Sequence, residues 1–331
     1  MSDQSLLVRD IGEAGLLKRL QRFCPPGVVG DDGAIIETVA DRSLVVTTDV
    51  LVDGVHFSDR TTTPFDVGWR ATAANLSDLA AMGATPLGIV VGLSLPGVQP
   101  VSWVEEVYRG MANCLELYRT PLVGGDVCRS SIVTLAITAF GEVVPQRAIR
   151  RNLAQPGDAI VVTGLHGLSR GGLELLLAPD SATLEPAERA KLIEAHQRPK
   201  PRLDVLPYLT KIPPMAIAGM DSSDGLADAI EQICQAGEVG AIINRSKIAV
   251  FSGLPKLANL ATVWDWIFYG GEDFELVLCL SPQFAARLVQ ELGEDAAIIG
   301  EITANRSIEV VGGDNLTGTQ ILNRGKEFRH F

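Results

Sequence analysis

Six short motifs combine carboxylates with glycine, hydroxyl or amide groups at the ends of apolar segments. They are GDDG (30–33), TTD (47–49), NLSD (75–78), GGD (124–126), DSSDG (221–225) and GGED (270–273). Carboxylate, hydroxyl and carbonyl oxygens are the ligands that hard cations such as Mg²⁺ prefer. Glycine lets the backbone turn sharply and approach a phosphate closely. Together the six motifs predict a magnesium-dependent site for phosphate chemistry.

Each motif also has a purely structural interpretation when it is taken singly. An aspartate beside glycine commonly forms a turn, and a serine or aspartate before a helix commonly caps it. The joint occurrence of the motifs favours a shared function, and two details support it. Asp49 follows a β-branched run at 44–48, where no turn carboxylate is needed. Asp221 and Asp224 are one helical turn apart, so both can face a single pair of ion sites.

Histidine and cysteine chemistry is weakly represented. The sequence has no GxSxG elbow, no HExxH motif and no CxxC pair. Most of the five cysteines have apolar neighbours, which predicts reduced core residues rather than metal ligands or disulfides. Of the four histidines, only His56, in DGVHF (53–57), lies beside a motif. A substrate contact and an ordinary structural role both stay open for it.

Two further features favour structural roles. The glycine-rich segment 164–172 lies between a strand-like and a helix-like run, but it lacks GxGxxG spacing and a P-loop lysine. We interpret it as a structural turn, with a phosphate contact left open. The aromatic residues Trp264, Trp266, Phe268 and Tyr269 alternate as they would in a strand. We interpret them as core residues rather than a ligand platform.

Composition narrows the class of protein. The 331 residues carry a formal net charge of −12, so a free nucleic-acid-binding surface is not expected. Divalent cations would allow such an acidic chain to bind phosphates. Hydrophobic residues make up 47% of the chain, yet no apolar run approaches the ~20 residues of a membrane helix. The N-terminus lacks the layout of a signal peptide. We therefore expect a cytoplasmic enzyme with no membrane partner.

The periodicity of apolar residues predicts alternating strands and helices in two α/β halves, 1–150 and 151–331, with a Pro-Gly hinge at 155–158. In the first half we expect strands at 43–48, 87–95, 120–123 and 132–141, and helices at 67–82 and 102–118. In the second half we expect strands at 159–163 and 275–280, and helices at 172–177, within 179–201, at 224–236 and at 282–292.

The order of the motifs resembles the thiamine-monophosphate kinase family over nearly the whole chain, from about Gly30 to Phe331. The matching segments are GDDGAII, TTDVLVDGVHF, NLSDLAAMGATP, GGD, DSSDGLADA, GGEDFELV and the terminal His-Phe. NLSDLAAMGA is shared with a superfamily that includes aminoimidazole ribonucleotide synthetase, selenophosphate synthetase and a hydrogenase maturation protein. The addition of DGVHF and GGEDFEL points to the thiamine enzymes.

The resemblance implies a role for particular residues. Those expected to hold several Mg²⁺ ions around the ATP triphosphate are Asp31, Thr47, Thr48, Asp49, Asp78, Asp126, Asp221 and Asp224. Among them Asp49 and Asp126 are expected to be the most critical. ATP contacts are expected from Gly125, Asp126, Arg151 and Ser223. Thiamine phosphate is expected to contact His56, Glu272 and the aromatic ring of Phe328.

The resemblance also implies an α/β (α+β) architecture like that of aminoimidazole ribonucleotide synthetase. The N-terminal domain, 1–150, would bind ATP and Mg²⁺ through a mixed sheet with helices, and would form a barrel with a second copy in a homodimer. The C-terminal domain, 151–331, would be an α/β sandwich that completes the nucleotide and substrate site.

The implied reaction is direct in-line transfer of the ATP γ-phosphate to thiamine phosphate, giving thiamine diphosphate. The acceptor phosphate has a second pKa of ~6 and is mostly dianionic at neutral pH, so no residue is expected to act as a general base. Other enzymes of the superfamily, a metal-dependent phosphohydrolase and a non-catalytic acidic metal-binding protein are the alternatives. Selenophosphate synthetase would need a reactive cysteine in an N-terminal glycine-rich loop, whereas the N-terminal segment here offers only Cys24, beside two prolines. The hydrogenase maturation protein would end in cysteine, whereas this sequence ends in Phe331.

Overall fold

The chain forms two compact units in a computed structural model that describes residues 6–26, 28–29, 34–211, 213 and 215–312, with the backbone of 320–321. One unit comprises Met1–Leu79 and Thr85–Glu142, and the other comprises Ala80–Ala84 and Val143–Phe331. The sequence-based boundary at 150 falls inside the second unit. Asp31 and Phe328 lie outside the described residues.

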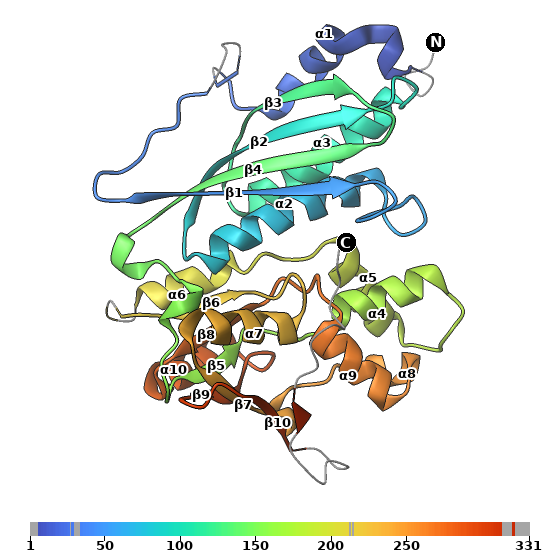
Figure 1. Ribbon diagram of the computed structural model, residues 1–331. Coiled ribbons are helices and arrows are strands. Elements are labelled where there is room, and N and C mark those ends of the chain that lie inside the picture. Colours follow the sequence, from blue (N-terminus) through green and yellow to red (C-terminus); the bar gives the residue numbers. More distant parts are fainter. Residues whose placement is uncertain are drawn as a thin grey trace. The chain divides into compact units, whose positions relative to one another are not determined.

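The first unit contains a four-stranded sheet with the strand order β1-β4-β2-β3. β2 pairs parallel to β3 and antiparallel to β4, which confirms a mixed sheet. Figure 1 shows α2 and α3 on one face of this sheet. The elements are α1 (Val8–Leu20), η2 (Gln21–Phe23), β1 (Ser43–Val52), α2 (Pro64–Ala81), β2 (Thr85–Leu95), α3 (Val101–Leu117), β3 (Leu122–Arg129) and β4 (Thr134–Val143).

Alternation along the strands explains why one face of this sheet is covered. In β4, Leu135, Ile137 and Ala139 are fully buried, whereas the residues between them are half-buried. Successive side chains of a strand point to opposite faces, so the buried set packs toward the helices. On β1 the outward positions include Leu44, which is 54% exposed, and Val46, which is 53% exposed. The described residues therefore leave the other face of the sheet uncovered, with exposed apolar side chains along β1.

Helices α2 and α3 touch through their backbones at two glycines. A Cβ atom on Gly68 would lie 1.8 Å from the carbonyl oxygen of Val107, and one on Gly110 would lie 1.8 Å from that of Phe65. The glycine of each helix thus packs directly against the main chain of the other, which allows the two helices to approach very closely. This contact fixes α2, which carries the NLSD motif.

The second unit contains a seven-stranded mixed sheet with the order β11-β10-β7-β9-β5-β8-β6. Its strands are β5 (Ala159–Val162), β6 (Ala218–Asp221), β7 (Gly240–Asn244), β8 (Leu276–Leu280), β9 (Ala297–Thr303), β10 (Ile308–Val311) and β11 (Gln320–Ile321). Its helices are η3 (Pro145–Arg147), η4 (Arg151–Leu153), α4 (Leu168–Leu177), α5 (Pro186–Gln197), η5 (Leu203–Val205), α6 (Leu206–Thr210), α7 (Leu226–Gly237), η6 (Arg245–Lys247), α8 (Leu254–Leu257), α9 (Leu260–Tyr269) and α10 (Pro282–Leu292).

Helices cover both faces of this second sheet. In β5, Ile160 and Val162 pack with α4, α7 and α9, whereas Ala159 and Val161 pack with α6 and α10. Strands buried on both faces need apolar residues at every position, and all four residues of β5 and all five of β8 are buried. The predicted C-terminal α/β sandwich is confirmed. None of the described helices is long and apolar enough to span a membrane.

Several local predictions are wrong. The aromatic residues from Trp264 to Tyr269 lie in helix α9, because Asn259 accepts a hydrogen bond from the Thr262 amide and starts a helical turn there. Alternation is a poor guide to secondary structure in such a short apolar run. Their predicted core role is confirmed, because Phe268 is buried and the other three pack against the same core. Among the cysteines, Cys114, Cys234 and Cys279 are buried as expected, but Cys128 is exposed on β3.

Candidate active site

The TTD and NLSD motifs meet between β1 and α2. The Thr47 hydroxyl donates a hydrogen bond to Oδ2 of Asp78, and the Asp49 amide donates one to Oδ1 of Asn75 over 3.0 Å. Asn75 is fully buried and donates in turn to the Ala71 carbonyl. Positions three apart on a helix share a face, so α2 presents Asn75 and Asp78 to the same strand. Two motifs 26 residues apart, measured from Asp49 to Asn75, thus form one polar cluster.

Both TTD and GGD lie inside strands, whereas we expected strands to end before Asp49 and Gly124. β1 runs on to Val52, and β3 runs on to Arg129 because its pairing with β2 continues through Gly125–Val91 and Asp126–Gly92. Local turn chemistry was overridden by this ladder.

Strand alternation separates two residues that were predicted as metal ligands and are adjacent in sequence. Thr48 donates to the Ile137 carbonyl and accepts a hydrogen bond from Thr138, on the uncovered face of the sheet. The register of β3 on β2 places Asp126 on that same face. Thr47, by contrast, faces Asp78 on α2. The structure therefore brings Thr47 and Asp78 together but does not bring Thr48 or Asp126 to them.

His56 lies in a tight loop that follows β1. Its Nδ1 accepts a hydrogen bond from the Val52 amide over 3.1 Å, so the ring proton of the neutral imidazole lies on Nε2. Gly54 has a φ of +79° and its amide donates to the Phe57 carbonyl. The buried side chain of Arg70 donates to the His56 carbonyl over 3.4 Å. The loop is held by its own backbone and by α2, which fixes the orientation of the imidazole.

The DSSDG motif forms the turn between β6 and α7. Asp221 is the buried last residue of β6, whereas Asp224 is exposed before α7 begins at Leu226. We expected the two aspartates to lie one helical turn apart. Instead, both precede α7 and neither lies on a helix. Gly225 has a φ of +113°, and a Cβ there would lie 2.8 Å from the Phe268 carbonyl oxygen. Only glycine fits this turn against the end of α9.

The GGED motif lies directly beside this turn. The Glu272 amide donates to the Ser223 carbonyl over 2.7 Å, and the Ser222 amide donates to the Glu275 carbonyl over 2.8 Å. Gly271, Glu272 and Phe274 have φ values of +66°, +58° and +53°. A left-handed non-glycine residue costs of order 1–3 kcal/mol and often marks a functional segment. Two motifs that are far apart in sequence thus form one strained, hydrogen-bonded pair of loops.

Residues 164–167 of the glycine-rich segment form a turn, as expected, whereas 168–172 are the first residues of α4. The Asp273 carboxylate accepts hydrogen bonds from the amides of Gly167 and Ser169, at 2.7 and 2.9 Å. These amides begin α4, so Asp273 already occupies the place that an anion would take at this helix N-terminus. Burial raises the pKa of Asp273 to about 7, while the hydrogen bonds from the Ser169 and Gly167 amides act to lower it.

Two buried histidines belong to this region, and neither was predicted from the sequence. Nε2 of His166 lies 3.1 Å from the Ser222 hydroxyl. Nδ1 of His196 lies 3.2 Å from the Ser169 hydroxyl and 4.0 Å from Oε2 of Glu272. His166 directly follows a strand in the glycine-rich segment, which was an available signal. His196 is 76 residues from Glu272, and no local pattern connects them.

The stability of the protein should depend on pH through His166. Burial lowers the pKa of His166 from its ordinary value of 6.5 to about 4, so the folded state binds its proton less readily than the unfolded state. The contribution of His166 to the free energy of unfolding is therefore constant above pH 6.5. It falls by about 3 kcal/mol in total as the pH drops through 4. The contribution of Asp273 changes with pH in the opposite direction, because its pKa is raised and stability is lost as the pH rises. Urea unfolding of the wild type and of His166→Gln, both in EDTA, isolates the histidine.

In that comparison, the wild type should lose more stability than His166→Gln between pH 6.5 and 4. Parallel stability curves for the two proteins would show that the imidazole does not titrate in this range.

Two of the remaining predicted contact residues, Arg151 and Ser223, lie near α7. Nη1 of the exposed Arg151 donates to Oε1 of Gln232 on α7 over 2.6 Å. The Ser223 hydroxyl donates to Oδ1 of Asp221 over 3.3 Å. Asp31 and Phe328 are not described. Within the described part of the chain, no three His, Cys, Asp or Glu side chains group closely enough to hold a metal ion. The donor set is carboxylate and hydroxyl oxygen, which is the chemistry that suits Mg²⁺.

Comparison with known proteins defines the class. Residues 30–143 match the family described as AIR synthase related protein, N-terminal domain, and residues 155–313 match AIR synthase related protein, C-terminal domain. The chain is therefore a two-domain protein of the AIR synthase related type, with one mixed sheet in each domain.

More similar proteins narrow this class to one family. A thiamine-monophosphate kinase of Synechococcus elongatus is 50% identical over 100% of this chain and 99% of its own. The crystal structure of the thiamine-monophosphate kinase of Stenotrophomonas maltophilia K279a is 32% identical with a TM-score of 0.78, covering 89% of this chain and 95% of that one. AaThiL complexed with AMPPCP and TMP is 31% identical with a TM-score of 0.76, covering 98% and 99%. The chain belongs to the thiamine-monophosphate kinase family of phosphotransferases.

Proposed function

We propose that this protein transfers the γ-phosphate of ATP directly to thiamine phosphate, producing ADP and thiamine diphosphate. The observation that carries the proposal is the 50% identity, along the whole chain, to a thiamine-monophosphate kinase. The complex of AaThiL with AMPPCP and TMP supports it, because that protein aligns with 98% of this chain. The pairing of DSSDG with GGED adds support, since it joins a proposed ATP contact, Ser223, to a proposed acceptor contact, Glu272.

The main obstacle to this reaction is repulsion between two anions. Two unit charges ~4 Å apart repel by ~4 kcal/mol at an effective dielectric of ~20, and the acceptor and the triphosphate present several such pairs. Mg²⁺ ions would neutralise this charge and align the in-line attack. The residues proposed to hold them are Asp31, Thr47, Thr48, Asp49, Asp78, Asp126, Asp221 and Asp224. Thr48 faces away from Thr47, so its hydroxyl lies on the opposite face of the sheet from the Thr47 hydroxyl.

The other proposed contacts bind and orient the two substrates. Gly125, Arg151 and Ser223 contact ATP. Nε2 of His56 carries a proton that can be donated to the acceptor phosphate. The Glu272 carboxylate can face the cationic thiazolium ring, and Phe328 can stack on it. The acceptor oxygen is already deprotonated at neutral pH, so no side chain is needed as a base.

A direct assay tests this function. The protein is incubated with ATP, Mg²⁺ and thiamine phosphate, and the products are separated by chromatography. We expect one thiamine diphosphate for each ADP, with no phosphorylated protein trapped during turnover. Parallel reactions contain formylglycinamidine ribonucleotide, or water as the only acceptor. Turnover in either of these without thiamine diphosphate formation would assign the chain to a synthetase or a phosphohydrolase, and no turnover in any would indicate a non-catalytic protein.

We also propose that the protein is a homodimer joined through the uncovered sheet face of the first unit. Leu44, Val46 and Val50 project from this face of β1 and are about half exposed. Half-exposed apolar side chains on this face, which also carries Thr48 and Asp126, favour burial against a second copy.

Val46→Asp should dissociate the dimer, because a carboxylate would be buried without a partner at the interface. Size-exclusion chromatography with light scattering should show a fall from twice the chain mass of 35.3 kDa to once that mass. Val98→Asp is the matched control, because Val98 is 58% exposed in the loop after β2 and lies outside the sheet. A Val46→Asp protein that keeps the wild-type mass would refute this interface.

A further inference from the structure

We propose that Arg202 is a positioning residue, which holds the segment 270–275 through Glu275 and thereby fixes Glu272 for the acceptor substrate. Arg202 follows α5 and is 70 residues from Glu272. It acts on Glu272 through Glu275. The part that concerns the acceptor rests on the proposed function.

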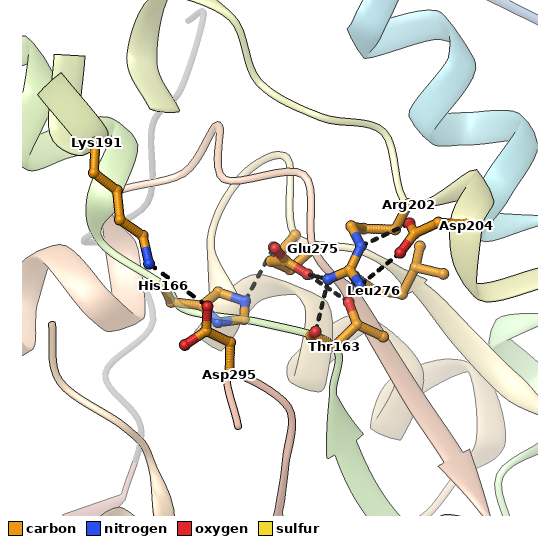
Figure 2. A network of polar contacts seen from close by, with 9 residues as sticks. Thr163, His166, Lys191, Arg202, Asp204, Glu275, Leu276 and Asp295 are labelled. Atoms are coloured by element: carbon orange, nitrogen blue, oxygen red, sulfur yellow. Dashed lines mark hydrogen bonds and ion pairs between the residues drawn. The ribbon is translucent and has the colours of Figure 1, made fainter. Parts of the chain in front are cut away.

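Arg202 occupies the centre of a polar network, shown in Figure 2. Its Nη1 donates to Oε2 of Glu275 and, over 2.6 Å, to the Thr163 carbonyl. Its Nε and Nη2 donate to the two carboxylate oxygens of Asp204, at 2.9 and 3.0 Å. The side chains of Arg202 and Glu275 are only 14% and 16% exposed. A guanidinium can make all these contacts at once because its donors form a planar fork, which a lysine lacks.

Glu275 is the point at which this network reaches both motifs. Its Oε2 also accepts a hydrogen bond from the Thr163 hydroxyl over 2.6 Å, which joins it to the end of β5. Its backbone carbonyl accepts from the Ser222 amide. A Cβ on Gly164 would lie 2.4 Å from Oε1 of Glu275, so the glycine makes room for this carboxylate. The position of Glu275 therefore decides how the GGED segment meets the DSSDG turn.

The GGED segment needs such a clamp because its backbone is strained. Gly271, Glu272 and Phe274 are all left-handed, and two of them have side chains. Strained conformations persist only where the surrounding structure over-determines them. The segment is held at one end by the Glu272 amide on Ser223 and at the other by Glu275 on Arg202 and Thr163. Between them, the Asp273 carboxylate is bound by the amides of Gly167 and Ser169. Loosening the Arg202 end should therefore displace Glu272.

The DSSDG turn has supports of its own. Asp221 is fixed in β6 by pairing with Leu276, and the Ser222 hydroxyl is bound by His166. Loss of the Arg202 clamp should therefore affect the acceptor contact more than the ATP contact. This asymmetry separates positioning from a general loss of folding.

The decisive variant is Arg202→Lys, which keeps the charge and loses the fork. We expect the KM for thiamine phosphate to rise about tenfold, with the KM for ATP changed less than about twofold, because misplaced contacts weaken only the ligand they touch. Arg306→Lys is the matched control, since Arg306 pairs with Glu238 at the surface and both are at least 70% exposed. It should leave both KM values unchanged.

A second variant guards against misfolding. Arg202→Met leaves the Glu275 charge buried without a partner, so it is combined with Glu275→Gln, which keeps an acceptor for Thr163. This pair should reproduce the split between the two KM values. Equal changes in both KM values, or none, would overturn the proposal.

Amide hydrogen exchange provides a readout that does not depend on activity. The peptide that covers 270–276 should exchange at least about tenfold faster in Arg202→Lys than in the wild type, while peptides of α10 remain unchanged. If the wild type fails to phosphorylate thiamine phosphate, the proposed function is wrong, and this measurement still decides the role of Arg202. Unchanged exchange at 270–276 would refute the clamp.

Discussion

Asp49→Asn should reduce kcat by on the order of 10²–10³-fold or more while the protein remains folded. Asp49 lies inside β1, and its amide, which the substitution does not alter, is bound by the buried Asn75. Asparagine has nearly the same shape as aspartate, so packing and strand pairing should be retained. The change removes one negative charge from the proposed Mg²⁺ ligands. Steady-state rates at increasing Mg²⁺ concentration, with thermal unfolding in parallel, measure both effects.

Asp41→Asn is the matched control for this substitution. Asp41 is exposed two residues before β1, and its φ of +63° suits asparagine as well as aspartate. This variant should have wild-type rates. A near-normal rate for Asp49→Asn at saturating Mg²⁺ would show that the Asp49 carboxylate is not a metal ligand.

Gly110→Ala should lower the free energy of unfolding of the first unit by about 2 kcal/mol or more. The new methyl group would lie 1.8 Å from the Phe65 carbonyl oxygen and 3.1 Å from the Trp69 nitrogen. Both atoms belong to the backbone of α2, so they cannot move aside as a side chain would. Alanine stabilises a helix by about 1 kcal/mol relative to glycine, whereas overpacking against rigid backbone atoms costs about 3 kcal/mol or more. The clash is therefore expected to win.

Urea unfolding measures this loss, with Gly92→Ala as the control. A Cβ on Gly92 would meet no atom closer than 3.6 Å, so that variant should have nearly wild-type stability. Because α2 carries Asn75 and Asp78, Gly110→Ala should also weaken activity at temperatures where it remains folded. A stabilised Gly110→Ala protein would mean that the helices do not approach as closely as described.

The pattern of the sequence predicted most elements but placed several boundaries wrongly. The long periodic helix α3 was predicted as 102–118 and spans Val101–Leu117, because its apolar spacing is sustained over several turns. Asp126 was expected after a strand and lies within β3. The extension of β3 depends on its ladder with β2, whose residues lie more than 30 positions earlier. Pairing of this kind leaves no local signature.

The candidate site shows the same division. The six motifs and their order can be recognised in the amino-acid sequence, and they suffice to indicate phosphate chemistry and a family. The roles of Asp31 and Phe328 stay predictions, as do the metal ligands. The parts that sequence reasoning missed, such as His196 beside Glu272 and Arg202 beside Glu275, are contacts between distant segments. Each residue has an unremarkable local context, so only the fold reveals its partner.

The sequence by itself determined the kind of chemistry, since oxygen ligands and glycines are properties of residues. It also determined the alternation of strands and helices, since periodicity is a property of short segments. Tertiary structure decided which motifs meet. Thr47 joins Asp78 while its neighbour Thr48 faces away, because β1 continues through the motif and alternates its side chains. The left-handed backbone of Glu272 likewise persists because Ser223 and the Glu275 network hold it, and those contacts exist only in the folded chain.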